Sequence, residues 1–492
     1  MASSAPPLIG NPSAQLDLPE GLTRALIDLV RDLDFGALPE PVRRRARHSL
    51  TDTLGVIALG ATTDPARMLR RAVLGPPVAP GADGAATVFG PDPAGAHPLD
   101  AALANGLAGH IRDFDDAGAG GHISAIIVPA ALALAESRGA SGADVMSALV
   151  AGYETAFRVN HLLTDSHYYI GFHSSGTVGT FAAAAAGCRL LRLDPGQWSM
   201  AFGIAGSLAG GLLASFGSMT KPLHSGHAAR SGLLAALLAS EGFTGSDRVL
   251  EHEAGFARTH TLRSDAAAAL APLGEPWALA GMIYKFNASC SGTHSGGDGI
   301  RALVREHGFS AADVAAITIR VPRIQTEVAN IQWPQTVEQA KFSIRFVAAA
   351  ALLGINTAEA FPHRDSQVAD PEVQAAIGLV TVLPLDGVDH GGAADIEVVL
   401  KAGPVLAASV NSIRPIEDAD AEQAAIEDKF RRTAGTLWPP GAVAAAARRL
   451  ARFEDEPSVR SFLADLSGSA LAGTASASTA SVDTASASTA DA

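Results

Sequence analysis

Four clusters of chemically capable residues stand out from an alanine- and leucine-rich background, and the first lies where a helix is expected to end. His110, Asp113, Asp115 and Asp116 stand close together, and a glycine-rich stretch leads from them to His122. Asp113 and Asp116 would share one helical face if the helix continued that far. Closely packed carboxylates raise one another's pKa, so one of them could act as a general base near neutral pH. A divalent metal site and an acidic helix end in solvent fit the same residues.

The second and third clusters place histidines and a lysine near expected helix starts. His173 lies in GFHSSGTVG, beside an apolar helix, as either a hydrogen-bonded core residue or a catalyst. Lys221 precedes a proline, which predicts an extended backbone and a side chain displayed where a helix begins. His224 and His227 follow it. An ammonium group beside a helix N-terminus would bind a carboxylate, and a solvated surface lysine is the alternative.

The fourth cluster crowds polar side chains into ten residues, which are Lys285, Ser289, Cys290, Thr293 and His294. Cys290 and His294 invite a thiol-nucleophile interpretation, but a spacing of four residues does not by itself make a catalytic dyad. The chain contains no G-x-S-x-G, so a hydrolase elbow is excluded. Neither G-x-x-x-x-G-K-[ST] nor a strand–G-x-G-x-x-G–helix pattern is present, which disfavours nucleotide binding.

Lysine is rare in this chain, and arginine supplies most of the basic residues. The five lysines are Lys221, Lys285, Lys341, Lys401 and Lys429. A lysine in such a background can be retained for its compact charge and its movable pKa. We interpret Lys401 and Lys429 as surface residues.

Composition excludes several classes of function. The net charge of −14 argues against a nucleic-acid or anionic-membrane partner, because phosphate contacts need clustered basic residues. Apolar runs fall short of the roughly 20 residues of a membrane span. Two cysteines in 492 residues and no basic or apolar leader segment predict a cytoplasmic protein. An anionic substrate would need positive charge within its own site.

Apolar residues at helical spacing predict helix after helix in the first part of the chain. The expected ranges include Gly21–Leu33, Pro41–Leu59, Leu99–Ile111, Ser124–Glu136, Ala143–Leu163, Gly176–Leu191, Pro195–Leu213 and His227–Ser240. Ser141 and Asp144 form the pattern of a capping box. These elements must position the clusters described above.

The pattern changes near residue 275. Alternation predicts a strand at Ala315–Pro322 and a hairpin of Ile396–Leu400 with Val405–Val410, with a helix at Glu338–Leu353 between them. We therefore expect a mostly α protein: a helical domain from residues 1–275 and 411–466, and a smaller α+β domain from 276–410. Residues 467–492 are almost entirely Ser, Thr and Ala, which predicts a disordered tail.

In their order along residues 20–465, eight stretches resemble the MmgE/PrpD family, which includes 2-methylcitrate dehydratases, cis-aconitate decarboxylases and iminodisuccinate epimerases. These are DTLGVIALGA, DFDD, VPAALALAE, AGYETAFR, GFHSSGTVGTFAAAA, TKPLHSGHAARSG, KFNASCSGTH and EQAKFS. The resemblance implies a homodimer whose subunits hold a helical domain built from both chain ends and an α+β lid. It implies a site in the cleft without metal or organic cofactor.

The resemblance also assigns roles. Asp113 and His122 match acid–base residues, Lys221 and Lys285 match substrate-facing lysines, and His173 matches a site histidine. We add His224, Ser289 and His294 as substrate-binding candidates. All three reactions approach a carbanion beside a carboxylate, whose added negative charge lysines would neutralise.

The expected function is a cofactor-free lyase of a small polycarboxylate, of the 2-methylcitrate dehydratase kind. An epimerase of a related dicarboxylate, a cis-aconitate decarboxylase and a non-catalytic carboxylate-binding relative are the alternatives. The chain has Ala117, Asn287 and Phe346 where the family often has Thr, His and Tyr, and its glycine loop before His122 is one residue shorter than in decarboxylases. These departures predict poor cis-aconitate decarboxylase activity.

Overall fold

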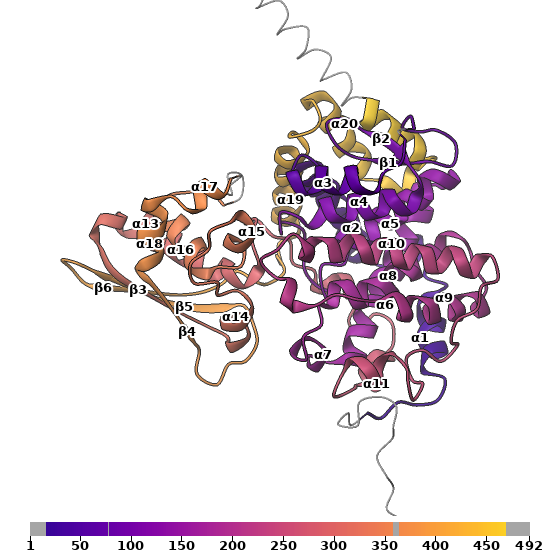
Figure 1. Cartoon of the computed structure of the whole chain (residues 1–492), viewed down its shortest axis with the longest axis horizontal. Coiled ribbons are helices and arrows are strands. Elements are labelled where there is room, and N and C mark those ends of the chain that lie inside the picture. The colour runs from indigo at the N-terminus through magenta and orange to yellow at the C-terminus, as the bar shows by residue number, and fades with distance from the viewer. Residues whose placement is uncertain (1–15, 77, 358–363, 469–492) are drawn as a thin grey trace, which may run out of the picture.

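The computed structural model describes residues 16–76, 78–357 and 364–468. It is mostly helical with a small mixed sheet, which confirms the predicted fold class. Figure 1 shows a large helical body beside a smaller lobe that contains the four-stranded sheet. No helix in the described part of the chain combines the length and apolarity that crossing a bilayer requires.

The helical body is built from both the early and the late parts of the chain. Its early helices are α1 (Leu22–Val30), α2 (Glu40–Gly60), α3 (Asp64–Val73), α4 (Pro98–His110), α5 (Ser124–Arg138), α6 (Gly142–Leu163), α7 (Ser166–Tyr169), α8 (Ser174–Leu190), α9 (Pro195–Leu208), α10 (Thr220–Ser240), α11 (Phe256–His260) and α12 (Ala266–Ala269). A short hairpin joins β1 (Ala86–Val88) to β2 (Ala94–Ala96). The late helices are α19 (Ala419–Ala434) and α20 (Pro440–Leu450), followed by a helix over 459–468.

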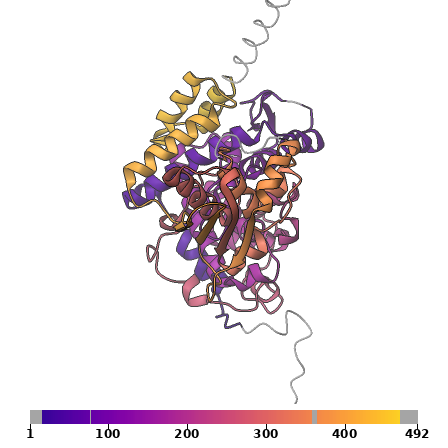
Figure 2. The same ribbon diagram turned by 90° about the vertical axis from the view of Figure 1, so that its left-hand side faces the viewer.

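One apolar core joins these two parts. It runs from Leu22 to Tyr284 and takes in Ile426 through Leu466, and Figures 1 and 2 show the late helices lying against the early ones. The helix over 459–468 includes the buried Ser467. Residues 467 and 468, which we assigned to the tail, are therefore helical, and the rest of the predicted tail, 469–492, lies outside the described residues.

Glycines allow α4, α8 and α10 to pack closely. A Cβ atom on Gly226 of α10 would lie 2.3 Å from the Leu103 carbonyl oxygen of α4, and one on Gly232 would lie 2.4 Å from the Thr180 carbonyl oxygen of α8. Such distances are closer than any normal contact, so the glycines are required for the spacing. This packing brings the start of α10 beside the end of α4 and the start of α8, where three of the four sequence clusters lie.

The second lobe holds a four-stranded sheet in the order β4-β3-β5-β6. β3 (Val314–Val321) pairs in parallel with β4 (Val380–Pro384) and antiparallel with β5 (Ala393–Leu400), which forms the predicted hairpin with β6 (Val405–Asn411). Its helices are α13 (His294–His307), α14 (Arg323–Val328), α15 (Val337–Ala340), α16 (Ile344–Leu352), α17 (Asp365–Val368) and α18 (Pro371–Gly378). A separate apolar cluster, including Phe114 and Phe346, joins this lobe to the body.

Three helix predictions need correction. The single helix expected at Glu338–Leu353 is two, because the Ser343 side chain accepts a hydrogen bond from the Phe346 N–H and starts a new helix. The helix that begins at Pro195 ends at Leu208, not Leu213. Lys221 is not extended: α10 already begins at Thr220, and a proline is tolerated in the first turn, where backbone N–H groups have no helical partner.

Candidate active site

The first cluster lies in a turn and not on a helix. α4 ends at His110, and Asp113 adopts a φ of +49°, a left-handed conformation that ends the helical path. Asp113 and Asp116 therefore do not share a helical face. The turn instead aims the three carboxylates of Asp113, Asp115 and Asp116 at different partners, and all three are buried.

Asp113 lies between two ammonium groups. Lys221 Nζ donates to Asp113 Oδ2 at 2.6 Å, while Lys285 Nζ donates to Oδ1 and, at 3.2 Å, to the Asp113 carbonyl oxygen. Burial alone would raise the pKa of Asp113, but the two lysines outweigh it and hold the pKa well below its usual range. Burial lowers the pKa of Lys285, and Asp113 more than compensates, so the pKa is raised. Asp113 is thus a fixed anion and a poor proton acceptor.

Four of the five lysines converge on this turn. Besides Lys221 and Lys285, Lys341 Nζ donates to the Ile111 carbonyl oxygen at 2.5 Å, and Lys429 Nζ donates to the Phe114 carbonyl oxygen at 2.6 Å. Lys429 also pairs with Asp52 at 2.7 Å, with both side chains fully buried. Our interpretation of Lys429 as a surface residue is therefore wrong, whereas Lys401 is exposed as predicted.

Asp115 lies between two histidines. His110 Nδ1 is 2.9 Å from Asp115 Oδ1, and His122 Nδ1 is 3.2 Å from Asp115 Oδ2. The two imidazole rings have centroids 4.3 Å apart. Burial opposes the charge of Asp115, but both histidines favour it, so its pKa lies well below the usual value. Burial lowers the pKa of His110 to about 3, and burial with the nearby Lys285 lowers that of His122.

Asp116 is the carboxyl group whose pKa is raised. Burial, with a smaller contribution from nearby Asp52, raises it to about 8. Its side chain accepts a hydrogen bond from Ser124 Oγ, which lies 2.6 Å from the Tyr153 hydroxyl. The raised pKa expected from crowding is therefore found at Asp116, but burial is its main cause, and the hydrogen bonds of this carboxyl lead into the helical body.

A cavity of about 300 Å³ opens beside this turn. This volume is within the range of small-molecule sites, about 300–1,000 Å³. The lining comes from the glycine loop, α6, α7, the start of α8, α10 and the fourth cluster: Gly120, Gly121, His122, Asn160, Thr164, Asp165, Tyr168, His173, Ser174, Ser175, Phe216, Lys221, Cys290 and Ser291. The cavity therefore unites all four sequence clusters.

The start of α8 supplies donors to this cavity. The backbone N–H groups of Ser174 and Ser175 have no hydrogen-bond acceptor within the described ranges, as expected for a first helical turn. His173 is the N-cap residue of the helix but makes no capping hydrogen bond with its side chain, whose Nδ1 lies 3.0 Å from His224 Nδ1. Burial, followed by Lys221, lowers the pKa of His173 well below its usual value and that of His224 to about 4. The cavity thus offers one ammonium group, neutral imidazoles and free amide donors.

The predicted site residues do not all reach the cavity. His122, His173 and Lys221 line it, whereas Asp113 and Lys285 do not; Asp113 pairs with both Lys221 and Lys285. His224 supports His173. Ser289 and His294 instead bond locally: His294 Nε2 donates to the Ser289 carbonyl oxygen at 3.1 Å, and Ser289 Oγ lies 2.8 Å from Thr293 Oγ1.

Sequence reasoning missed several contributors. Asn160, Tyr168, Ser174 and Ser175 line the cavity. His110, which belongs to the first cluster but was given no role, shares Asp115 with His122. Ser174 and Ser175 directly follow His173, so the helix start could have indicated them. Asn160 and Tyr168 gave no signal, because their place depends on how α6 and α7 pack.

The same turn contains a set of possible metal ligands. One donor atom each from His110, Asp113, Asp115 and His122 lies within 4.8 Å of the others. Two ammonium groups already contact Asp113, and they would repel a divalent cation. The donor set therefore fits a resident metal poorly, and a metal-free reaction remains a prediction.

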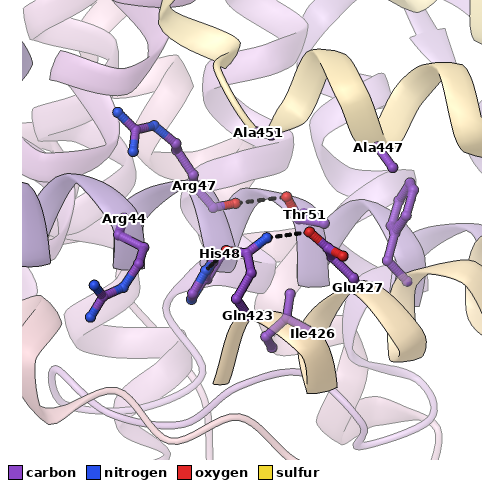
Figure 3. A pocket seen from close by; sticks show the side chains of 10 residues that line it. Arg44, Arg47, His48, Thr51, Gln423, Ile426, Glu427, Ala447 and Ala451 are labelled. Carbon is purple, nitrogen blue, oxygen red and sulfur yellow. Dashed lines mark hydrogen bonds between the residues drawn. The ribbon is translucent and has the colours of Figure 1, made fainter. Parts of the chain in front are cut away.

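Two other hollows lack this chemistry. One of about 60 Å³ lies between α2 and the late helices, lined by residues such as Arg47, His48 and Glu427 (Figure 3), and is too small for a polycarboxylate. Another of about 770 Å³ lies between α3 and α15. Two of its charged side chains, Arg67 and Glu338, pair with Asp64 and Lys341.

Comparisons with known proteins agree with this architecture. A model of the MmgE/PrpD N-terminal domain matches residues 24–268, and one of the C-terminal domain matches residues 288–452. The chain is 28% identical to human cis-aconitate decarboxylase over 89% of this chain and 92% of the relative. It is 30% identical to the mouse cis-aconitate decarboxylase over 72% and 74% of the two chains. A cis-aconitate decarboxylase-like protein of Aspergillus oryzae is 31% identical over 59% and 63%. The chain belongs to the MmgE/PrpD family.

Proposed function

We propose that this protein is a carboxy-lyase that acts on a small unsaturated polycarboxylate of the cis-aconitate type. One observation carries the proposal: a buried ammonium group, two neutral imidazoles and the free amides of a helix start line a single cavity. The named activity of the relatives supports decarboxylation as the reaction. The hydro-lyase activity expected from the sequence remains a second candidate.

The fixed charges of the site suit an anionic substrate, whose binding would raise the pKa of the nearby histidines. Asp113 and Asp115 contribute two negative charges, and Lys221 and Lys285 contribute two positive charges, so these fixed charges cancel. A bound polycarboxylate adds negative charge and thereby raises the pKa of the histidines beside it. Substrate binding would therefore convert His122 or His173 from a neutral imidazole into a proton donor.

Decarboxylation needs both groups that bind carboxylates and a proton donor. As CO₂ leaves, the electrons of the broken C–C bond form a new double bond, and the electrons of the old double bond take up a proton at its far carbon. Lys221 and the Ser174 and Ser175 amides would hold the remaining carboxylates. One lysine–carboxylate contact at 4 Å contributes on the order of 4 kcal/mol at an effective dielectric near 20. His122 or His173 would deliver the proton.

Three of the four sequence departures do not oppose this reaction. Ala117 pairs through its backbone with Ile283, Phe346 is buried in the apolar cluster that contains Phe114, and the Asn287 side chain contacts Thr357. All three positions lie outside the cavity lining. A hydroxyl or imidazole missing at these three positions would not leave a substrate group unpaired. The fourth departure, the shorter glycine loop, does line the cavity and still supports the expectation of a poor decarboxylase.

A specific observation favours the second candidate. In the resting protein His122 is neutral, and an unprotonated imidazole beside a carboxylate-binding site can remove a proton from carbon, which dehydration and epimerisation both require. Carboxylate binding without turnover is the non-catalytic alternative. These reactions differ in the products they form.

Proton NMR of the purified protein in D₂O would separate them, using cis-aconitate, 2-methylcitrate, citrate and iminodisuccinate as substrates. We expect loss of CO₂ from cis-aconitate and one deuterium in the product, with kcat/KM at or above about 10⁴ M⁻¹s⁻¹, the lower end for typical enzymes. Water loss from 2-methylcitrate would favour the hydro-lyase, and deuteration of iminodisuccinate without net conversion would favour the epimerase. Binding of all four acids without any of these changes would contradict enzymatic function.

A further inference from the structure

The hydrogen atoms of the His110 and His122 pair can be assigned from the groups that surround them. His122 Nδ1 has two neighbours within hydrogen-bond distance, Asp115 Oδ2 at 3.2 Å and the Asp116 carbonyl oxygen at 3.0 Å. His110 Nδ1 has the two oxygens of Asp115, at 2.9 and 3.1 Å. All of these neighbours are acceptors, because the pKa of Asp115 is held low and the carboxylate is ionised.

An imidazole nitrogen that meets only acceptors must carry the hydrogen. Both rings are neutral in the resting protein, since burial lowers both pKa values. Each ring therefore has its hydrogen on Nδ1 and a lone pair on Nε2. Because His122 lines the cavity and its Nδ1 faces Asp115, its Nε2 is the nitrogen left to reach a substrate.

We propose that Asp115 is a positioning residue that fixes His122 in the Nδ1–H tautomer, so that the proton transferred in the reaction enters and leaves at His122 Nε2. The inference rests on the proposed function for the identity of the substrate, but the tautomer is a property of the resting protein. His110 completes the arrangement, because it occupies the other carboxylate oxygen of Asp115.

The three neighbouring aspartates differ in the partners that their carboxyl groups contact. Asp113 pairs with Lys221 and Lys285. Asp116 directs its carboxyl to Ser124, away from the imidazoles. Asp115 alone has its carboxylate between two rings, where one ionised group sets two tautomers. Its full burial excludes water that would otherwise compete for those nitrogens.

Asp115→Asn tests the inference, because it replaces one oxygen with an NH₂ group of nearly the same size. The NH₂ must then face one of the two rings, and His122 is left with the Asp116 carbonyl oxygen as its acceptor when that ring is its own. We expect kcat to fall at least about 100-fold, as for loss of a positioned general base or acid, with KM changed less than about threefold because Lys221 and the α8 amides remain. Asp116→Asn is the matched control, with kcat within about threefold of the parent, since its side chain does not touch His122.

A spectroscopic measurement tests the tautomer without any turnover. In the full-length protein labelled with ¹⁵N-histidine, the ¹⁵N shifts of His122, assigned from their loss in His122→Gln, should show a protonated Nδ1 and a bare Nε2. A protonated Nε2 in the resting protein would overturn the proposal, even if Asp115→Asn failed to fold. Unchanged kcat in a folded Asp115→Asn variant would also overturn it. If no substrate is turned over, the proposed function fails, while the ¹⁵N spectrum still decides the tautomer.

Discussion

Four lysines meet at one turn, yet only Lys221 reaches the cavity. We predict that Lys221→Met lowers kcat/KM at least about 100-fold, or roughly 2.7 kcal/mol of transition-state stabilisation, because the substrate loses its direct cation. Lys285→Met should cause a similar loss through Asp113, which would then bind Lys221 alone and weaken its pairing with substrate. Steady-state kinetics checks both variants. Lys401→Met, which removes an exposed lysine, is the control and should remain within about twofold. Normal turnover in the Lys221 variant would contradict this role.

The raised pKa of Asp116 leads to a second prediction, about how the free energy of unfolding depends on pH. Its pKa of about 8 is raised above the unfolded value near 3.9. The folded state therefore holds a proton that the unfolded state releases between pH 4 and 8, so this group's stabilising contribution falls as pH rises through that window. The loss is at most about 1.4 kcal/mol for each pH unit. In Asp116→Asn this dependence disappears.

Urea unfolding at pH 5 and pH 8 measures that difference. The free energy of unfolding should fall more steeply with pH in the parent than in Asp116→Asn, by on the order of 2–4 kcal/mol over the three units. Equal pH dependence in the two proteins would mean that Asp116 is already ionised when folded.

The residue types of the site were predictable from the sequence, but their partners were not. Lys221 and Asp113 were both named as site residues, yet the sequence separation of 108 residues hides their contact. Lys429 was misread because a lysine on an amphipathic late helix normally faces solvent. Only the packing of α19 against α2 shows that it meets Asp52.

At the scale of elements, the start of α8 can be altered without destroying the helix. We predict that Ser174→Pro raises KM for a polycarboxylate about tenfold or more, because it removes an N–H donor to a charged group, an interaction that contributes about 1.5–3 kcal/mol. Proline is well tolerated at the first helical position, and His173 already has the extended backbone that a following proline requires.

Ser174→Ala is the matched control, since it removes the hydroxyl group and keeps the amide. Its KM should change less than that of Ser174→Pro, while the circular dichroism of both variants should match the parent. Equal effects of the two substitutions would assign binding to the hydroxyl group and contradict a role for the helix start.

How well each helix was predicted depends on whether local sequence or contacts with distant segments determine where it begins and ends. Helices with a continuous apolar stripe and a cap, such as Gly142–Leu163 with its Ser141–Asp144 capping box, are found within one or two residues of the expected range. Larger errors occur in the helix that ends at Leu208 and at the site, where α10 starts at Thr220, seven residues before the expected His227. There the contacts among distant segments override local preference.

At the scale of the whole molecule, the late part of the chain closes the core of the early part. Removing residues 469–492, which are nearly all Ser, Thr and Ala, should leave the melting temperature unchanged, because that composition has little apolar surface to bury. Removing residues 459–492 should lower it by several degrees, since Phe462, Leu463 and Leu466 are buried in the main core. Differential scanning calorimetry compares the two. A large loss from the shorter deletion would contradict the compositional argument.

The expected homodimer remains a prediction that light scattering would check.

The pair formed by Lys429 and Asp52 links the late helix to both the core and the active-site turn. Lys429 lies in α19, contacts Asp52 in α2 and donates to the Phe114 carbonyl oxygen, in the turn that holds Asp113, Asp115 and Asp116. Lys429→Met keeps most of the volume but leaves Asp52 buried without its cation. Breaking a buried ion pair from one side costs about 3–5 kcal/mol.

We therefore expect Lys429→Met to lower the free energy of unfolding by about 3 kcal/mol, measured by urea unfolding at pH 7. Because the turn also loses a donor, kcat should fall under conditions where the variant is fully folded, although Lys429 lies outside the cavity lining. The double variant Asp52→Asn with Lys429→Met removes both charges and should recover part of the stability, since an uncompensated carboxylate then no longer exists. Recovery of stability without recovery of kcat would show that the ammonium group holds the turn in place independently of its pairing with Asp52. Unchanged stability in the single variant would instead mean that Asp52 is already protonated and that the ion pair contributes little to the fold.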